Sequence, residues 1–289
     1  MTSRYRTRPQ VKFREFAELE LRRVSMSNTI WALMAGSKLA SIALDSARGS
    51  GRTLSEIFPV VEHIGRFNVR IDDAHALLAA AETDLSVMAM SQAIALHEDF
   101  VKTCLTWLLP LGKLTPGQLN NANTFNIHET MNAASGRNVR TGSLRLFHLS
   151  RLMRNCHIHA GGSGSGALQR HMEGMTRSQR LEWSALTLRP FVVINEGEYV
   201  TIGVNELVAT LAIGKRLAYE VNLCLQRAVP RRMWADIAVR DYFTLDGSKP
   251  PRDPAAGKRL SSYARTNFSA IALSETTLKS ALKRYIPTK

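Results

Sequence analysis

The chain has 289 residues, 45% of them apolar and 21% charged, which is enough to bury one large helical core or two small ones. Its formal net charge of +14 favours a polyanionic partner, nucleic acid first, because each neutralised phosphate releases condensed counterions. No uninterrupted apolar run approaches the roughly 18 residues that span a bilayer, and the basic start lacks the apolar region of a signal peptide, so we expect a cytoplasmic protein without a membrane partner.

Two long helices are predicted in the first part of the chain. Residues 19–47 carry apolar side chains at spacings of three and four without a proline, and the turn at 48–52 ends this helix. Asp84 opens a second helix over residues 85–109. Its apolar residues cover nearly the whole circumference, which is typical of a central core helix, and Pro110 stops it.

A third helix is predicted over residues 143–160, followed by a short β-hairpin. The pair Gly161–Gly162 suits a helix C-terminal cap, and the glycine and serine residues after it are predicted to be mobile. Residues 191–195 and 198–202 are rich in β-branched and aromatic side chains and flank two turn residues. This pattern predicts a small hairpin inside a helical protein.

The last part of the chain is predicted to hold a long helix, a linker and a basic helix. The long helix covers 205–228 and ends at Pro230, and the polar segment 247–259 is a predicted linker. In the basic helix over 274–286, Ser274 is the expected N-cap. Its predicted inward residues are Leu278, Ala281 and Leu282, and its outward residues are Lys279, Lys283 and Arg284.

These elements predict a mainly α protein: a helical bundle with a small β-hairpin insertion and a basic helical C-terminal extension. The predicted regions are an N-terminal helical region over 1–68, a bundle over 69–230 with the hairpin near 190–202, and the extension over 231–289.

Positive charge is concentrated around the third helix. Residues 137–180 contain eight arginines and one acidic residue, Glu173, for a net charge of +7. Arginine forms planar, bidentate contacts with phosphate. The candidate nucleic-acid-binding residues in this stretch are Arg137, Arg140, Arg145 and Arg151.

Three segments place a histidine five or six residues after an arginine, and one of them differs from the others. Arg70 is followed by Ile71 and Arg151 by Leu152, whereas Arg154 is followed by the polar Asn155. The third match, which ends at His159, lies near the end of a predicted amphipathic helix and within the most basic stretch. This context singles it out.

The R-N-x-x-x-H sequence of Arg154, Asn155 and His159 resembles the R-x4-6-H signature of HEPN ribonucleases. Upstream, Glu98 and Lys102 resemble the E-x3-K/R element found in part of that superfamily, and at i, i+4 they share one helix face. An ordinary surface ion pair explains them equally well. The resemblance covers residues 70–230 and implies a HEPN-like bundle there.

The three residue types also suit RNA cleavage without a metal ion. The 2′-hydroxyl must lose a proton, attack the phosphorus and expel the 5′-oxygen, which must gain a proton. Histidine as a residue type titrates near neutral pH, so His159 can act as general base or acid, and arginine stays charged, so Arg154 can hold the phosphate. Asn155 would orient the histidine or a phosphate oxygen. We expect 2′,3′-cyclic phosphate and 5′-hydroxyl ends.

The resemblance further implies RNA as the partner, a homodimer with a composite active site, and a toxin or antiviral defence effector with an antitoxin or trigger protein. One histidine is poorly placed for both proton transfers, which is why two copies of the motif would face each other. His157 is a supporting candidate, but it lies about 200° from His159 around a regular helix, which favours a structural role.

No cofactor and no metal site are predicted. The remaining histidines show no ligand spacing, and His97 fits a buried, hydrogen-bonded histidine. The three cysteines are far apart, so neither a disulfide framework nor a thiolate zinc site is expected. Two alternatives remain: a nucleic-acid-binding regulator without catalysis, using the C-terminal basic helix, and a HEPN-like dimeric scaffold.

Overall fold

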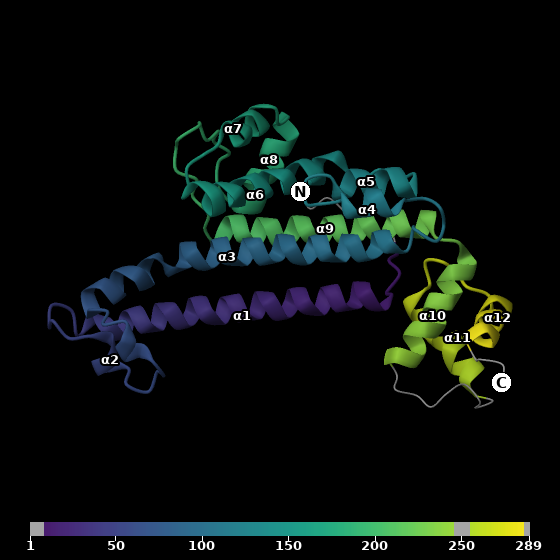
Figure 1. Cartoon of the computed structure of the whole chain (residues 1–289), viewed down its shortest axis with the longest axis horizontal. Helices are drawn as coiled ribbons and strands as arrows, with labels where there is room; N and C mark the ends of the chain where they lie inside the picture. The colour runs from purple at the N-terminus through teal and green to yellow at the C-terminus, as the bar shows by residue number, and fades with distance from the viewer. Residues whose placement is uncertain (1–8, 246–254, 286–289) are drawn as a thin grey trace. The chain divides into compact units, whose positions relative to one another are not determined.

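The computed structural model describes residues 9–245 and 255–285, and this part of the chain is mainly α-helical, as predicted. Figure 1 labels most of the helices. In chain order the elements are α1 (Arg14–Asp45), α2 (Leu54–Ile57), the 3-10 helix η1 (Ile64–Arg66), α3 (Ile71–Thr106), α4 (Pro116–Asn120), α5 (Ile127–Ser135), α6 (Thr141–Ala160), α7 (Gly166–Glu173), α8 (Arg177–Thr187), α9 (Val204–Ala228), α10 (Arg231–Leu245), α11 (Ala256–Asn267) and α12 (Glu275–Tyr285).

The long predicted helices are present, and α3 differs most from its prediction. It begins at Ile71 rather than after Asp84, which lies exposed within the helix. Aspartate inside a helix costs only a few tenths of a kcal/mol, roughly, and the alanine- and leucine-rich residues 76–81 are strong helix formers. Asp84 was therefore the wrong start signal.

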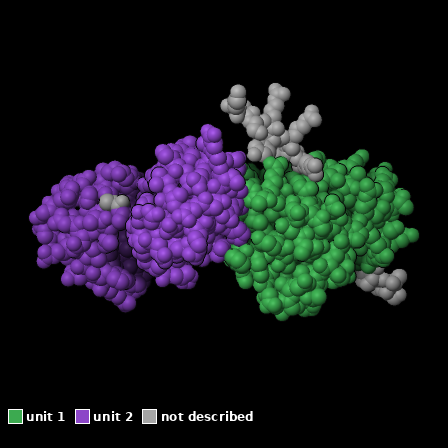
Figure 2. Space-filling view, turned by 90° about the horizontal axis from the view of Figure 1, so that it is seen from above, with its two compact units in different colours: residues 1–21, 95–144, 213–289 green, residues 22–94, 145–212 purple. Residues whose placement is uncertain are grey.

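The described chain divides into two compact units, which Figure 2 colours separately. Unit 1 comprises residues 1–21, 95–144 and 213–289, and unit 2 comprises residues 22–94 and 145–212. The sequence predicted three consecutive regions instead. Because α1, α3, α6 and α9 each contribute residues to both units, compact units here do not follow contiguous stretches of sequence.

Aromatic side chains form the core of unit 1. Phe13 is fully buried, and its ring centroid lies 4.9 Å from that of Trp107 and 5.9 Å from that of Trp234. Trp234 in turn meets Phe268 edge-on at 6.2 Å. Tilted and edge-to-face pairs of this kind add stabilisation beyond the area that they bury.

The segment before α1 is anchored by distant parts of unit 1. The Val11 backbone N–H donates to Oδ1 of Asn222 at 3.2 Å, and the Asn222 amide donates back to the Val11 carbonyl at 2.7 Å. The Lys12 N–H donates to the Asn267 carbonyl at 2.7 Å. These bonds satisfy backbone groups that no helix pairs.

Three C-terminal helices of unit 1, α10, α11 and α12, pack on one another (Figure 1). Leu278 and Ala281 are buried, as predicted, and Leu282 is half-buried. The Ser274 hydroxyl caps the helix by accepting from the Thr277 N–H at 3.2 Å. Of the predicted linker, residues 247–254 lie outside the described part, and helix α11 begins at Ala256.

In unit 2 the predicted β-hairpin is not confirmed. Residues 191–202 contain no strand and instead run beside the glycine-rich segment that follows α6. The Gly164 N–H donates to the Glu198 carbonyl at 2.7 Å, and the Val200 N–H donates to the Gly162 carbonyl at 2.8 Å. The β-branched pattern predicted that 191–195 pairs with 198–202, whereas the single bridge of this segment joins Tyr199 to Ser163 in the segment after α6.

This pairing also corrects the prediction that the glycine-rich segment is mobile. A Cβ on Gly162 would overlap the Tyr199 ring, and one on Gly164 would lie 2.7 Å from the Asn195 carbonyl oxygen. Glycine is therefore required at 162 for close approach to an aromatic ring and at 164 for close approach of two backbones.

Candidate functional site

The motif residues Arg154, Asn155 and His159 all lie on α6, which stays helical to Ala160. Asn155 and His159, four residues apart, share one face of the helix, whereas Arg154 lies about 140° from His159 at 100° per residue. Arg154 and Asn155 are half-buried and His159 is exposed. One copy of α6 thus presents the amide and the imidazole together, but directs Arg154 elsewhere.

His157 has the structural role that its position predicted. Its Nε2 lies 2.5 Å from the Val200 carbonyl oxygen, and its ring meets that of Tyr199 edge-on at 5.6 Å between centroids. The side chain therefore fastens the end of α6 to the extended segment around Val200 and is directed away from His159.

Five polar residues line the outward face of α6 in unit 2. Their spacings of three and four residues place them within about 120° of one another on an ideal helix. We call them the α6 polar face: Arg145, His148, Arg151, Asn155 and His159. Each is half-buried or exposed. The opposite face of α6 carries Leu146, Leu149 and Met153, all buried.

The N-terminal half of this polar face contacts α7 through hydrogen bonds. Arg145 donates from Nη2 to the His171 carbonyl at 3.0 Å, and the His171 Nε2 lies 2.9 Å from the Arg145 carbonyl oxygen. Arg151 donates from Nε to the His148 Nδ1 at 3.4 Å. The His148 and His171 rings stand nearly perpendicular, 6.4 Å apart.

Both histidines are held in the neutral form. Burial, helped by Arg151, His171 and Arg145, lowers the pKa of His148 to about 4. Burial also lowers the pKa of His171, although its hydrogen bond to the Arg145 carbonyl works in the opposite direction. A lowered pKa leaves an imidazole neutral but also makes it a weaker base, so these two rings are less suited than an ordinary histidine to act as a general base. The sequence analysis did not select either residue.

Arg137 and Arg140, the other predicted phosphate-binding residues, belong to unit 1 and both contact Glu220. Arg137 Nη2 lies 3.2 Å and Arg140 Nε 3.1 Å from the two oxygens of this buried carboxylate. The ion pairs offset part of their charge. Their role in nucleic-acid binding stays a prediction, and Arg145 and Arg151 are the arginines that join the α6 polar face.

Glu98 and Lys102 also belong to unit 1. Lys102 Nζ lies 2.8 Å from a Glu98 oxygen, and the Thr124 hydroxyl donates to the same carboxylate. Beside them, His97 and His128 are buried, and their Nε2 atoms lie 2.9 Å apart. The buried, hydrogen-bonded His97 was predicted, whereas its partner was not.

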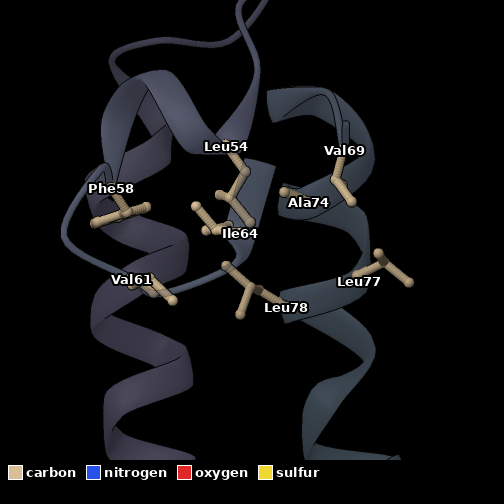
Figure 3. A pocket seen from close by; sticks show the side chains of 9 residues that line it. Leu54, Phe58, Val61, Ile64, Val69, Ala74, Leu77 and Leu78 are labelled. Atoms are coloured by element: carbon tan, nitrogen blue, oxygen red, sulfur yellow. The ribbon is translucent and has the colours of Figure 1, made fainter. Parts of the chain in front are cut away.

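A separate apolar cavity of about 370 Å³ lies in unit 2 between the end of α1 and the start of α3 (Figure 3). Its lining residues are Ala40, Leu54, Phe58, Val61, Ile64, Val69, Ala74, Leu77 and Leu78. Binding sites combine an apolar lining with a few polar groups that orient the ligand. This lining offers no such side chain, so the α6 polar face is the stronger candidate site.

Over residues 9–245 and 255–285, no three side chains of histidine, cysteine, aspartate or glutamate gather closely enough to hold a metal ion. Within the same ranges, no helix has the length and apolar character needed to cross a membrane. Comparisons of the chain with protein-family models, with curated proteins and with solved structures found no match.

Proposed function

We propose that the chain is a metal-independent endoribonuclease whose active site lies at the C-terminal end of the α6 polar face. The observation that carries the proposal is the shared face of Arg151, Asn155 and His159, which places an imidazole, an amide and a guanidinium along one accessible side of the helix. RNA is the proposed substrate because this helix lies in the most basic stretch of the chain.

In the proposed reaction His159 accepts the proton of the 2′-hydroxyl, the freed oxygen attacks phosphorus, and the bond to the 5′-oxygen breaks. The products carry a 2′,3′-cyclic phosphate and a 5′-hydroxyl. Asn155, one turn before His159, positions the imidazole or a phosphate oxygen. The proton for the leaving oxygen comes from a second histidine, which a second copy of the chain is proposed to supply.

Two arginines compete for the role of phosphate ligand, and each rests on a different argument. The sequence motif assigns the role to Arg154, whereas the geometry of the helix assigns it to Arg151, which lies on the same face as His159. A guanidinium stabilises the charge that develops on the phosphoryl oxygens. Variants of each residue distinguish the two assignments.

The test is cleavage of total tRNA and ribosomal RNA by purified protein in EDTA, which silences contaminating metal-dependent nucleases. We expect His159→Ala to lower cleavage by about a hundredfold or more, the usual effect of losing a general base. Matched controls are His63→Ala and Arg66→Ala, which remove exposed residues of the same types in unit 2 that lie on neither α6 nor α7.

Cyclic phosphate ends made by wild type and both controls, but not by His159→Ala, would support the proposal. Loss of cleavage in Arg151→Ala alone would favour the helix geometry, and loss in Arg154→Ala alone would favour the motif. Equal activity in all variants, or none in wild type, would refute it.

A further inference from the structure

The apolar cavity of unit 2 has a wall that backbone hydrogen bonds hold in place. The segment between α1 and α3 supplies five of its nine lining side chains: Leu54, Phe58, Val61, Ile64 and Val69. The Leu54 N–H donates to the Val69 carbonyl at 2.8 Å, and the Phe58 N–H donates to the Leu54 carbonyl at 2.9 Å. The Val61 and Ile64 N–H groups each donate to the lining residue three positions earlier. Because these bonds join one lining residue to another, the cavity is formed before a ligand arrives.

The two long helices complete the wall and leave one side open. Ala40 lies on α1, whereas Ala74, Leu77 and Leu78 lie on α3, facing the segment that connects the helices (Figure 3). Ala74 is buried, but Leu77 is 61% exposed and Val61 is 50% exposed. The cavity therefore opens to solvent beside Leu77 and Val61, and a ligand can enter from that side.

The chemistry of the wall selects an apolar, uncharged ligand. The wall exposes no polar atom to the cavity. An ordered water needs about two to four polar partners, so water is held poorly here and hydrocarbon displaces it without loss of hydrogen bonds to the protein. Residues 45–75, which surround the cavity, hold five acidic and four basic side chains, so their charges nearly cancel and favour neither an anionic nor a cationic ligand.

The volume of the cavity sets the size of the ligand. An apolar cavity of about 150 Å³ accommodates one benzene ring. In proportion, the volume of about 370 Å³ accommodates a hydrocarbon of roughly ten to fifteen carbon atoms. With no polar side chain to orient a ligand, recognition depends on the apolar area that the ligand buries.

We propose that this cavity binds the hydrocarbon chain of a neutral amphiphile, such as a long-chain alcohol, whose polar end stays in solvent beside Leu77 and Val61. The proposal does not rest on ribonuclease activity, because the cavity and the α6 polar face share no residue. Success or failure of either proposal therefore leaves the other unchanged.

The first test is equilibrium dialysis of the full chain against radiolabelled 1-hexanol, 1-octanol and 1-decanol. We expect one molecule to bind per chain, with an affinity that rises about fourfold for each added methylene, because each methylene buries a similar apolar area. An affinity that stays constant along the series, or no binding of 1-decanol, would overturn the proposal.

The second test fills the cavity. Ala40→Phe places a ring among the lining side chains, whereas Ala43→Phe is its matched control, since Ala43 is an exposed residue of the same helix that does not line the cavity. We expect Ala40→Phe to weaken 1-decanol binding by about tenfold or more and Ala43→Phe to bind as wild type does.

A third test changes the mouth of the cavity without placing a larger side chain inside it. Leu77→Glu introduces a carboxylate at an exposed lining position, and Met88→Glu, at a 67% exposed residue of the same helix away from the cavity, is its control. We expect Leu77→Glu alone to weaken 1-decanol binding, by about tenfold, because the ligand would desolvate the charge. Binding of several molecules per chain, or equal binding by all four variants, would show adsorption elsewhere on the surface and overturn the assignment.

Discussion

His148 and His171 show how burial keeps histidines neutral in the most basic part of the chain. Arg145 and Arg151 lie within hydrogen-bonding distance, so a proton on either imidazole would meet both a desolvation cost and like charge. The same two effects that keep the rings neutral also make acid pH unfavourable to this part of unit 2.

The stability of unit 2 should therefore fall in weak acid. Because the pKa of His148 is about 4 in the folded chain and near 6.5 in the unfolded chain, the unfolded state binds more protons between these values. The full stabilisation is present above pH 6.5 and declines as the pH falls toward 4. We expect a loss of about 2 kcal/mol in the free energy of unfolding between pH 7 and pH 4.5.

Urea unfolding across this pH range measures the effect. Glutamine does not titrate in this range, so His148→Gln should weaken the dependence of the free energy of unfolding on pH. His159→Gln, which changes an exposed histidine of the same helix, should leave this dependence unchanged. A profile for His148→Gln as steep as that of wild type would contradict the prediction.

Spacing along α6 could have identified most of the candidate site. Arg145, His148, Arg151, Asn155 and His159 recur at intervals of three and four, a pattern visible without a structure. The sequence analysis followed the Arg154 motif instead and omitted His148. His171 lies on another helix, and its approach to His148 depends on how α7 packs against α6, which no local pattern encodes.

At the scale of elements, the junction after α6 depends on two consecutive glycines with different requirements. Both have positive φ, +57° at Gly161 and +89° at Gly162, but only Gly162 lies against another side chain, the ring of Tyr199. At Gly161, the positive φ is the reason that glycine is favoured. At Gly162, both the positive φ and the close contact with the Tyr199 ring favour glycine.

We expect Gly162→Ala to lower the free energy of unfolding by about 3 kcal/mol, combining left-handed backbone strain of about 1 kcal/mol with overpacking of about 2 kcal/mol. Gly161→Ala should cost about 1 kcal/mol from strain alone. Thermal and urea denaturation of both variants measure the difference. Equal destabilisation would show that the Tyr199 contact is easily relieved.

Helix positions were predictable because periodicity is a local property, and the segment 191–202 was not. Its residues favour extended backbone, yet the partner that satisfies Val200 is Gly162, across two intervening helices in the sequence. Helix α3 shows the complementary error, in which a local signal at Asp84 was outweighed by the helix formers before it.

For the whole molecule, the distribution of charge separates the ribonuclease proposal from the alternative of a nucleic-acid-binding regulator. Helix α12 also offers basic residues: Lys279 and Lys283 are exposed on the side opposite the buried Leu278. Both proposals predict nucleic-acid binding that weakens as the salt concentration rises. The ribonuclease proposal assigns the phosphate contacts to α6, and the regulator alternative assigns them to α12.

We expect the double variant Arg151→Ala/Arg154→Ala to reduce the slope of log K against log salt concentration by about 0.7 for single-stranded RNA, because one of the two arginines is the proposed phosphate ligand and each lost phosphate contact removes about 0.7. Lys279→Ala/Lys283→Ala should leave the slope unchanged. Fluorescence anisotropy over a salt series measures both. A reduced slope in the lysine variant alone would favour the regulator.

The anchoring of Val11 by Asn222, and of Lys12 by Asn267, has a consequence for synthesis on the ribosome. The earliest described residues of unit 1 emerge long before the residues that hold them. Until α9 and then α11 have left the exit tunnel, the core around Phe13 is incomplete. Its apolar side chains therefore remain exposed to water or to chaperones. Closure of unit 1 thus follows the synthesis of α11, and a chain cut short within α9 would leave this core incomplete.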